Sequence, residues 1–329
     1  MITLAQLIKL EDYVSRYEWD LYRYSSQYIK LKKERWKELH SEWELAKQNG
    51  LFDDVPDFHD EIEKQPKVHK WNIFKRKQRQ KITSETLIEE QEADKADLYQ
   101  KLRLMSETDL KQYFLDELYP FQLKWATSTL SRVSNVHAKY QKHPHLKYFL
   151  QRFPDTYFLM YRPIFDIQNA AVEADIVLIN PIGIEIISFI DLPKGHTIMA
   201  GDERTWHIEA NDRRERMLNP SISLRRTEKF IQGMLHKDSI EFPIRKTILS
   251  RTNQIISATA PYKTNIVDYT SYPNWFAERQ RLRSPIKNIQ LKAADAILKH
   301  CQTDAVTRPD WEDVQAEKYV TVEQIEEEE

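Results

Sequence analysis

The amino-acid sequence predicts an α+β or α/β protein in which a long helical N-terminal region precedes a mixed β-sheet flanked by helices. Residues 3–49 carry apolar side chains at alternating spacings of three and four, which is typical of an amphipathic helix. Residues 155–191 contain short runs rich in Ile, Val and aromatic residues between turn-forming residues, as strands do. Asn219-Pro220 and Ser284-Pro285 each begin a further helical pattern, and a strand pattern over residues 245–257 separates them.

The first expected element is one continuous helix over residues 3–49. Thr3 and Gln6 form a capping box at its start, and Gly50 supplies the stop. Its apolar stripe consists of Leu7, Leu10, Val14, Tyr17, Leu21, Tyr24, Tyr28 and Leu31. Such a helix could bind a protein partner or self-associate as a coiled coil, or it could pack on its own chain. We favour packing on the chain itself, because bulky aromatic residues fit poorly in a two-stranded seam.

Two oppositely charged segments follow this helix. Residues 51–65 are acidic and turn-rich, whereas residues 67–81 are strongly basic. The basic residues Lys75, Arg76, Lys77 and Arg79 are candidates for nucleic-acid binding, since cations can follow a phosphate backbone while nearby aromatic rings stack on bases. The alternative is a solvated linker whose positive charge balances the acidic run before it.

The sequence also suggests where the parts of the chain begin and end. Ser106 and Asp109 form a second capping box, and Pro120 is expected to break or restart the helix that follows. We therefore expect a helical region over residues 1–105 and a sheet-containing domain over residues 106–303. The acidic tail, residues 304–329, is expected to be disordered.

Residues 172–191 predict the central feature of the sheet, two strands joined by a tight turn. The sequence Asn180-Pro181-Ile182-Gly183 supplies the turn residues. Glu173 and Asp175 stand two residues apart at the start of the first strand. Because residues two apart point to the same face of a strand, both carboxylates are expected to reach one site.

This hairpin resembles the nuclease-related domain (NERD), a branch of the PD-(D/E)XK nuclease superfamily. In that family an E-x-D pair opens one strand, an N-P-x-G turn follows, and the next strand ends in E-x-K. The resemblance implies a restriction-endonuclease-like sheet, with Asp175 as the metal-binding carboxylate. It places Ser188 where the family has its catalytic Glu and Ile190 where it has its catalytic Lys. Further matches to family motifs are Lys194, Gly195, Ile198, Gly201, Trp206 and the Asn219-Pro220 helix start.

The two replaced residues determine what chemistry remains. In such a site two carboxylates hold Mg²⁺ or Mn²⁺, and the ion lowers the pKa of the attacking water. Serine is a poor ligand for a divalent ion and isoleucine donates nothing, so Asp175 alone would bind metal weakly. The expected protein is catalytically degenerate, with Glu173 and Asp175 as remnants and no cofactor. The helix before the strands lacks the family's G-x-x-G-E element, and neither Gln122 nor Lys124 can be given its role.

Nearby acidic residues offer two ways to rebuild the site. Glu185 lies in the second strand, but residues 184, 186, 188 and 190 share a face and Glu185 points to the other. Asp191 and Lys194 follow the strand, so a relocated Asp191/Lys194 pair is the alternative that would preserve metal-dependent cleavage.

Composition limits the class of protein. The formal net charge of −2 shows no general basic excess. The single cysteine, Cys301, excludes an intrachain disulfide and fits a reducing compartment. No apolar run approaches the roughly 20 residues that span a bilayer, and no signal peptide is evident, so we expect a cytoplasmic protein without a membrane partner. His137, His143 and His145 could suggest a metal site, but we favour a surface loop, because Pro144 interrupts the ligand spacing.

Three functions remain open at this point. The first is a degenerate NERD-like protein that binds nucleic acid or a protein partner. The second is a metal-dependent nuclease acting on DNA or RNA with a relocated site. The third is a helical scaffold or assembly protein stabilised by its sheet domain. No Gly-rich nucleotide loop and no Ser-His-Asp nucleophile motif occurs in the sequence.

Overall fold

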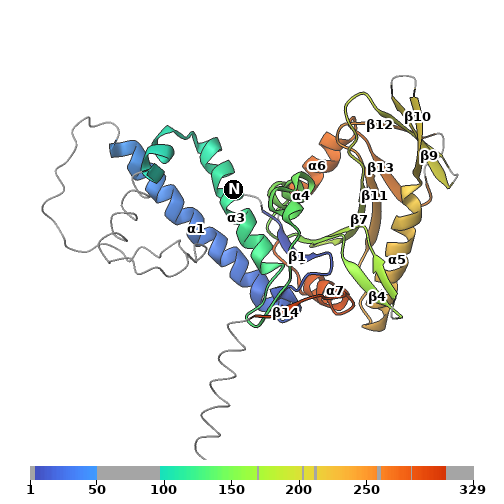
Figure 1. Cartoon of the computed structure of the whole chain (residues 1–329), viewed down its shortest axis with the longest axis horizontal. Helices are drawn as coiled ribbons and strands as arrows, with labels where there is room; N and C mark the ends of the chain where they lie inside the picture. Colours follow the sequence, from blue (N-terminus) through green and yellow to red (C-terminus); the bar gives the residue numbers. More distant parts are fainter. Residues whose placement is uncertain are drawn as a thin grey trace, which may run out of the picture. The chain divides into compact units, whose positions relative to one another are not determined.

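The computed structural model describes residues 4–49, 97–168, 170–201, 204–210, 213–257, 261–282 and 284–308. The chain forms two compact units (Figure 1). The larger unit combines Met1–Lys30 with Leu115–Glu329, and the smaller unit is Leu31–Phe114. The expected boundary at residues 105/106 therefore falls inside the smaller unit.

The larger unit is built on a six-stranded mixed sheet with the strand order β1-β3-β6-β7-β11-β13. The strands are β1 (Gln6–Leu10), β3 (Phe158–Tyr161), β6 (Ile176–Asn180), β7 (Gly183–Phe189), β11 (Ile244–Leu249) and β13 (Thr264–Val267). β3, β6 and β7 are antiparallel neighbours, whereas β7, β11 and β13 run parallel to one another. The predicted α+β class is confirmed, and the expected hairpin is β6–β7.

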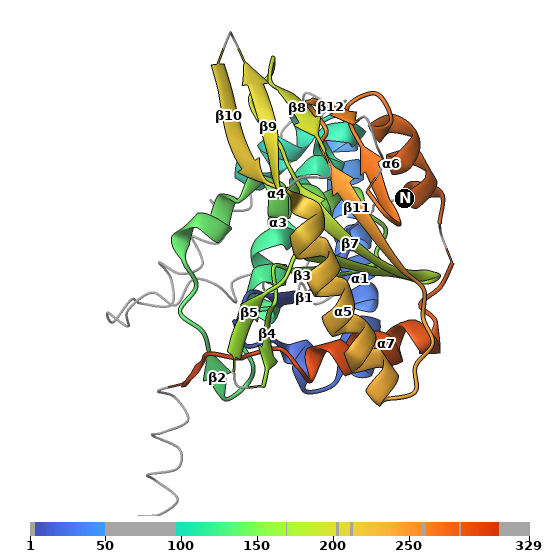
Figure 2. The ribbon, with the colours of Figure 1, turned by 90° about the vertical axis from the view of Figure 1, so that its right-hand side faces the viewer.

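Helices cover both faces of this sheet. α5 (Pro220–Lys237) packs along β7 and β11, as Figure 2 shows. α4 (Pro144–Arg152) and α6 (Tyr272–Arg281) lie on the opposite face, where the Phe149 ring meets Phe189 at 5.4 Å between centroids. α7 (Asn288–Leu298) also belongs to this unit and begins at Asn288 rather than at the expected Ser284-Pro285. The sequence did not reveal α6.

A second sheet has four strands in the order β10-β9-β8-β12. Its strands are β8 (Thr197–Ala200), β9 (Thr205–Ala210), β10 (Arg213–Leu218) and β12 (Gln254–Ser257). Trp206 is buried, and its Nε1 donates to the Gly201 carbonyl at 2.8 Å. The single strand expected over 245–257 is in fact β11 and β12, in two different sheets.

Two two-stranded sheets complete the larger unit. β4 (Ile164–Ile167) pairs with β5 (Ala170–Glu173) between β3 and β6. β2 (Arg132–Val133) pairs with β14 (Val306–Thr307), so residues 304–308 are part of the fold and not of a disordered tail as expected. The rest of the acidic tail, from residue 309, lies outside the described residues.

The expected helix over residues 3–49 is wrong in its first part. Residues 6–10 form β1, which pairs in parallel with β3, and a short 3-10 helix, η1 (Arg16–Glu18), follows. The helix α1 spans Leu21–Asn49. Every residue of β1 is buried, so its side chains do not alternate between core and solvent, and the sequence pattern mimics a helix stripe. Leu7 and Leu10 lie in the sheet core and cannot form a coiled-coil seam.

The aromatic part of the stripe packs on the chain itself, as favoured from the sequence. The rings of Tyr17, Tyr24 and Tyr28 each meet the Trp125 ring at centroid distances of 5.5–6.2 Å. Tyr17 and Tyr28 are almost completely buried. Aromatic edges packed in this way add stabilisation beyond their buried area.

Gln122 closes the free edge of β1. It lies on α3 (Glu107–Trp125), which continues through Pro120 instead of breaking there. The Gln122 Oε1 accepts from the Leu7 backbone N–H at 2.8 Å, and its Nε2 donates to the Ala5 carbonyl at 2.9 Å. The side-chain amide thus satisfies two backbone groups of an edge strand that would otherwise be buried without partners.

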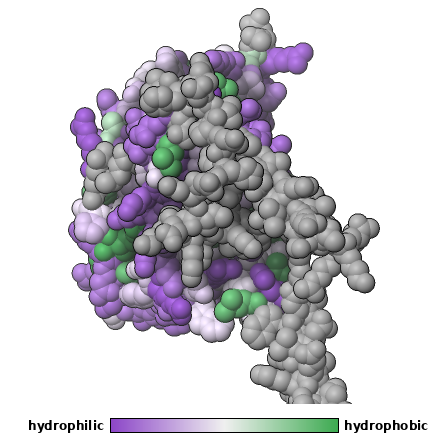
Figure 3. Space-filling model, turned by 90° about the vertical axis from the view of Figure 1, so that its left-hand side faces the viewer, coloured by the Kyte–Doolittle hydropathy of each residue, from purple (hydrophilic) through white to green (hydrophobic). Residues whose placement is uncertain are grey.

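The smaller unit contains the distal part of α1, a helical stretch over residues 97–104 and the first part of α3. The Trp36 ring packs on Phe114 at 5.2 Å, and Trp43 Nε1 donates to the Met105 carbonyl at 3.0 Å. The predicted capping box is confirmed, since Ser106 and Asp109 exchange hydrogen bonds between side chain and backbone. On the face shown in Figure 3, hydrophobic residues form only small separate patches.

No helix in the described part of the chain is both long and apolar enough to cross a membrane.

Candidate functional site

Asp175 lies directly before β6 and faces α5. Its Oδ2 accepts a hydrogen bond from the Thr227 hydroxyl at 2.8 Å, and its Oδ1 accepts one from the Ser223 hydroxyl at 3.0 Å. Thr227 and Ser223 are four residues apart on α5, so both point from one face of that helix. Burial raises the pKa of the Asp175 carboxyl above its usual range, although both hydroxyl hydrogen bonds and the Arg226 charge act against this shift. The site therefore favours a proton on Asp175 more than an ordinary aspartate site does.

Glu173 does not share this site, contrary to the expectation from the spacing. It ends β5 in a separate two-stranded sheet, where it pairs in register with Ile164. The Glu173 carboxylate forms an ion pair with the Arg162 guanidinium and is half exposed. The chain changes sheets between residues 173 and 176, so the rule that residues two apart share a face does not apply here.

Ser188 lies near the end of β7, and Ile190 follows that strand. The last antiparallel pair of the hairpin joins Ile176 to Ile187. Continuing that register by one position sets Ser188 opposite Asp175. Ile190 is buried and donates its backbone N–H to the Leu249 carbonyl at 2.8 Å. The position opposite Asp175 therefore holds a hydroxyl and not a second carboxylate.

Glu185 points to the opposite face, as strand parity predicts. It is buried and accepts hydrogen bonds from Thr247, Trp275 and Arg279 at 2.6–3.0 Å. Its partners come from β11 and α6, on the side of the sheet away from α5. Glu185 therefore holds α6 against the sheet and has no access to Asp175.

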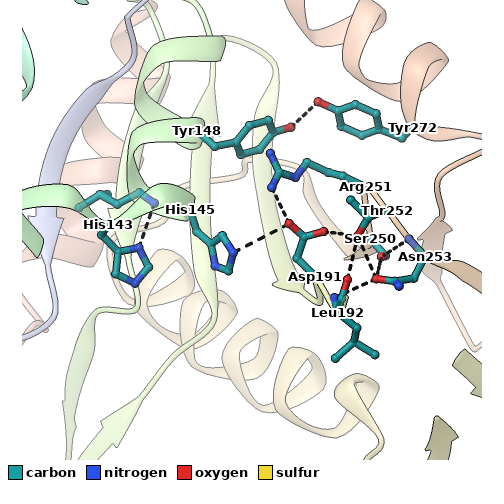
Figure 4. Close-up of polar contacts among 11 residues, drawn as sticks. His143, His145, Tyr148, Asp191, Leu192, Ser250, Arg251, Thr252, Asn253 and Tyr272 are labelled. Atoms are coloured by element: carbon teal, nitrogen blue, oxygen red, sulfur yellow. Dashed lines mark hydrogen bonds and ion pairs between the residues drawn. The ribbon is translucent and has the colours of Figure 1, made fainter. Parts of the chain in front are cut away.

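A polar cluster follows the carboxyl ends of β7 and β11 (Figure 4). Asp191 accepts from Arg251 Nη2 at 2.5 Å and from the Thr252 hydroxyl at 2.7 Å, and His145 Nε2 lies 3.9 Å from its Oδ2. The Arg251 guanidinium carbon lies 4.2 Å from the centroid of the Tyr148 ring. Carboxyl ends of neighbouring parallel strands are the place where open α/β sheets bind ligands.

The contacts within this cluster limit what it can do. Both Asp191 oxygens are engaged, so a metal ion would have to displace Arg251 or Thr252. Burial lowers the pKa of His145 despite the nearby Asp191, which keeps the imidazole neutral near pH 7. Lys194 is exposed and has no described contact with Asp191. The relocated Asp191/Lys194 pair considered from the sequence is therefore not assembled: Arg251 occupies the place of its cation.

Two of the three histidines near residue 140 cap local helices. His137 Nδ1 accepts from the Lys139 N–H and caps a 3-10 helix, η3 (Ala138–Lys142). His143 caps α4 by accepting from the Leu146 N–H at 3.3 Å. Within the described ranges no group of three or more His, Cys, Asp or Glu side chains is placed to hold a metal ion.

Several candidate residues lie outside the described residues. The basic residues Lys75, Arg76, Lys77 and Arg79 are among them, so their assignment to nucleic-acid binding stays a prediction. Conversely, the sequence reasoning missed Ser223 and Thr227. Two hydroxyl residues four apart, one turn after an Asn-Pro helix start, were the available signal.

Comparisons with known proteins give little further guidance. No family model matches the chain, and no solved structure matches it. A stretch of 44 residues is 43% identical to an RNA 2',3'-cyclic phosphodiesterase from Geobacillus stearothermophilus. This similarity covers 13% of the chain and 14% of that protein's length.

Proposed function

We propose that this chain is a nuclease-related protein that has lost cleavage and binds nucleic acid. The observation that carries the proposal is the environment of Asp175. Its carboxylate is enclosed by the Ser223 and Thr227 hydroxyls, and Ser188 follows Ile187, which pairs with the first residue of β6. One carboxylate with a raised pKa, facing a hydroxyl, gives neither the charge nor the oxygen ligands that Mg²⁺ needs.

The arrangement of elements supports the nuclease-related part of the proposal. Helix α4 precedes β3, an N-P-x-G turn joins β6 and β7, and an Asn-Pro step begins α5 before β11. The resemblance noted in the sequence has the same succession. Fold alone does not set function, so the assignment depends on the site and on binding measurements.

The short similarity to an RNA 2',3'-cyclic phosphodiesterase determines how binding should be tested. The name of that protein points to RNA as its substrate, and the similarity is limited to 44 residues. We therefore include RNA as well as DNA among the nucleic acids that the chain could bind.

A paired cleavage and binding assay tests the proposal. Plasmid DNA, single-stranded DNA and RNA are incubated with wild-type protein and with Asp175→Ala, each with Mg²⁺, Mn²⁺ or EDTA. We expect no metal-dependent cleavage above background in either protein. We also expect binding by the wild type that weakens as salt increases, because phosphate contacts release counterions. Cleavage abolished by Asp175→Ala, or no binding to any of the three, would contradict the proposal.

A metal-dependent phosphodiesterase is the second candidate, and its place would be the cluster around Asp191, where an ion would have to compete with Arg251 and Thr252 for the Asp191 oxygens. Acidic, cationic and imidazole groups meet there at the carboxyl ends of parallel strands. Asp191→Asn separates this candidate from the first. Metal-dependent cleavage that survives Asp175→Ala and disappears in Asp191→Asn would place the reaction at this cluster.

A further inference from the structure

Three cationic side chains from distant parts of the chain gather around the C-terminal end of α3. Arg16 comes from η1, Lys124 from the last turn of α3, and Arg308 follows β14. The Arg16 guanidinium carbon lies 5.4 Å from the centroid of the Trp125 ring, and its Nε donates to the Ser128 carbonyl at 3.2 Å. We call Arg16, Lys124 and Arg308 the cationic cluster.

Local strand pairing holds Arg308 in this cluster. β14 pairs with β2, and the Arg308 backbone N–H donates to the Ser131 carbonyl at 2.9 Å. Figure 1 shows β14 beside the N-terminal end of α1. The Arg308 Nε is buried and has no hydrogen-bond acceptor among the described residues. A buried donor of this kind costs free energy unless something outside these residues supplies an acceptor.

The charges of the cationic cluster oppose one another. Burial lowers the pKa of Arg16; Tyr24 acts against this shift, and the Arg308 charge adds to it. Burial, then the Arg16 and Arg308 charges, lowers the pKa of Lys124. The acidic side chain nearest to Arg16 in sequence, Glu18, is held by Lys9 at 2.5 Å and Thr303 at 3.1 Å.

An exposed aromatic residue lies three positions after Arg16 in the sequence. Trp19 follows η1, its backbone N–H donates to the Arg16 carbonyl at 3.2 Å, and 75% of its surface is exposed. Tyr22, at the start of α1, is also exposed. Cations that hold phosphates beside aromatic faces that stack on bases are the combination found on single-strand-binding surfaces.

We propose that the cationic cluster and Trp19 bind single-stranded nucleic acid, with phosphates on Arg16 and Arg308 and a base stacked on the Trp19 indole. This inference rests on the proposed nucleic-acid-binding function and assigns it to a surface that the Asp175 region does not include. The formal net charge of the chain is −2, so the binding comes from this local concentration of charge. Backbone phosphates and base faces are common to DNA and RNA, so both are tested.

Fluorescence anisotropy with labelled DNA and RNA single strands of about 15 nucleotides measures the affinity. The test proteins are Arg16→Gln/Arg308→Gln and Trp19→Ala in the full chain. We expect the double variant to bind about tenfold more weakly or worse. Its slope of log affinity against log salt should be shallower by roughly 1.4, the value for two lost phosphate contacts on a single strand. Trp19→Ala should weaken binding roughly fivefold or more.

Matched control variants separate this surface from general effects of charge and hydrophobicity. Arg213→Gln/Arg214→Gln removes two exposed arginines of β10, and Tyr262→Ala removes an aromatic residue that is 76% exposed. The affinity of both controls should stay within about twofold of wild type. This change is much smaller than the roughly tenfold loss expected when the two arginines of the cluster are removed. Arg16→Lys/Arg308→Lys keeps the charge and should recover most of the salt-dependent affinity, and thermal melting identifies any variant that fails to fold.

The outcomes distinguish this inference from the function on which it rests. Wild-type binding that is unchanged in both Trp19→Ala and the folded double Gln variant would overturn the assigned surface and leave nucleic-acid binding standing. If the double variant does not fold, the affinity of Trp19→Ala alone decides whether the assigned surface stands. Absence of wild-type binding to both DNA and RNA would overturn the function and the surface together.

Discussion

Arg279 holds Glu185 through two parallel hydrogen bonds, from Nε to Oε2 at 2.9 Å and from Nη2 to Oε1 at 2.8 Å. Both side chains are largely buried. Two-pronged contacts of this kind are among the strongest that proteins form between charged groups. In this chain they join α6 to β7 on the face opposite α5.

Removing one member of this pair should destabilise the protein strongly. Glu185→Ala leaves the Arg279 charge buried without its partner, so we expect a loss of about 3–5 kcal/mol in the free energy of unfolding. Chemical denaturation followed by circular dichroism measures this change. Glu215→Ala, on exposed β10, is the matched control and should change stability by less than about 0.5 kcal/mol. Equal small effects from both variants would show that the pair contributes little.

The pH dependence of stability should reveal the environment of Asp175. Its pKa is raised in the folded protein from an ordinary value of 3.8, so the folded state binds the proton more tightly than the unfolded state. This contribution to stability is fully present below about pH 3.8 and is lost as pH rises through the folded-state pKa. Asp175→Asn cannot ionise and should not lose it.

The measurement compares melting temperatures of wild type and Asp175→Asn over this range. The variant should gain on wild type as pH rises from about 4 to 7. A difference that stays constant over that range would show that folding does not shift the pKa of Asp175, and a difference that shifts in favour of wild type would show that folding lowers it; either result contradicts the expectation. Asp166→Asn is a suitable control, because this residue lies on exposed β4.

Gly183 should tolerate no side chain. A Cβ atom built there would stand 2.8 Å from the Pro243 carbonyl oxygen, and that oxygen already accepts the Ile184 N–H at 2.8 Å. Gly183→Ala should therefore cost about 1–3 kcal/mol of stability. Gly233→Ala, inside α5 with open space around it, should be neutral or stabilise by up to about 1 kcal/mol. Chemical denaturation measures the midpoints of the two variants. A shift of both midpoints in the same direction would contradict this expectation.

The edge of the six-stranded sheet should depend on Gln122. Gln122→Leu keeps the volume but removes the partners of the Leu7 N–H and the Ala5 carbonyl. Each buried backbone group left without a partner should cost about 1–3 kcal/mol. Gln232→Leu, at an exposed position of α5, is the control and should be close to neutral. Amide hydrogen exchange should show faster exchange at Leu7 in Gln122→Leu alone.

Local patterns were sufficient to predict much of the fold. The β6–β7 hairpin, the Asn219-capped α5, the Ser106 capping box and the orientation of Glu185 away from Asp175 all follow from residues close in sequence or from strand parity. They were predictable because turn residues, caps and alternation act over a few positions. The α+β class followed from the same signals.

The errors arose where distant segments decide the outcome. Residues 6–10 form a strand because β3, far along the chain, pairs with them, and no local signal reveals that partner. Glu173 and Asp175 diverge because the chain passes from one sheet to another between them. The cationic cluster joins residues 16, 124 and 308, which no spacing rule connects.

The parallel pairing of β1 with β3 has a consequence for synthesis. Gln6 Nε2 bonds to the Asp155 carbonyl across a sequence separation of 149 residues. A growing chain emerges N-terminal segment first, so β1 must wait until the chain has been made as far as Phe158 before the strand it pairs with exists. An apolar segment without its partner strand exposes surface that favours aggregation. We therefore expect expression of this protein to depend on chaperones, because β1 is an edge strand whose partner is made later.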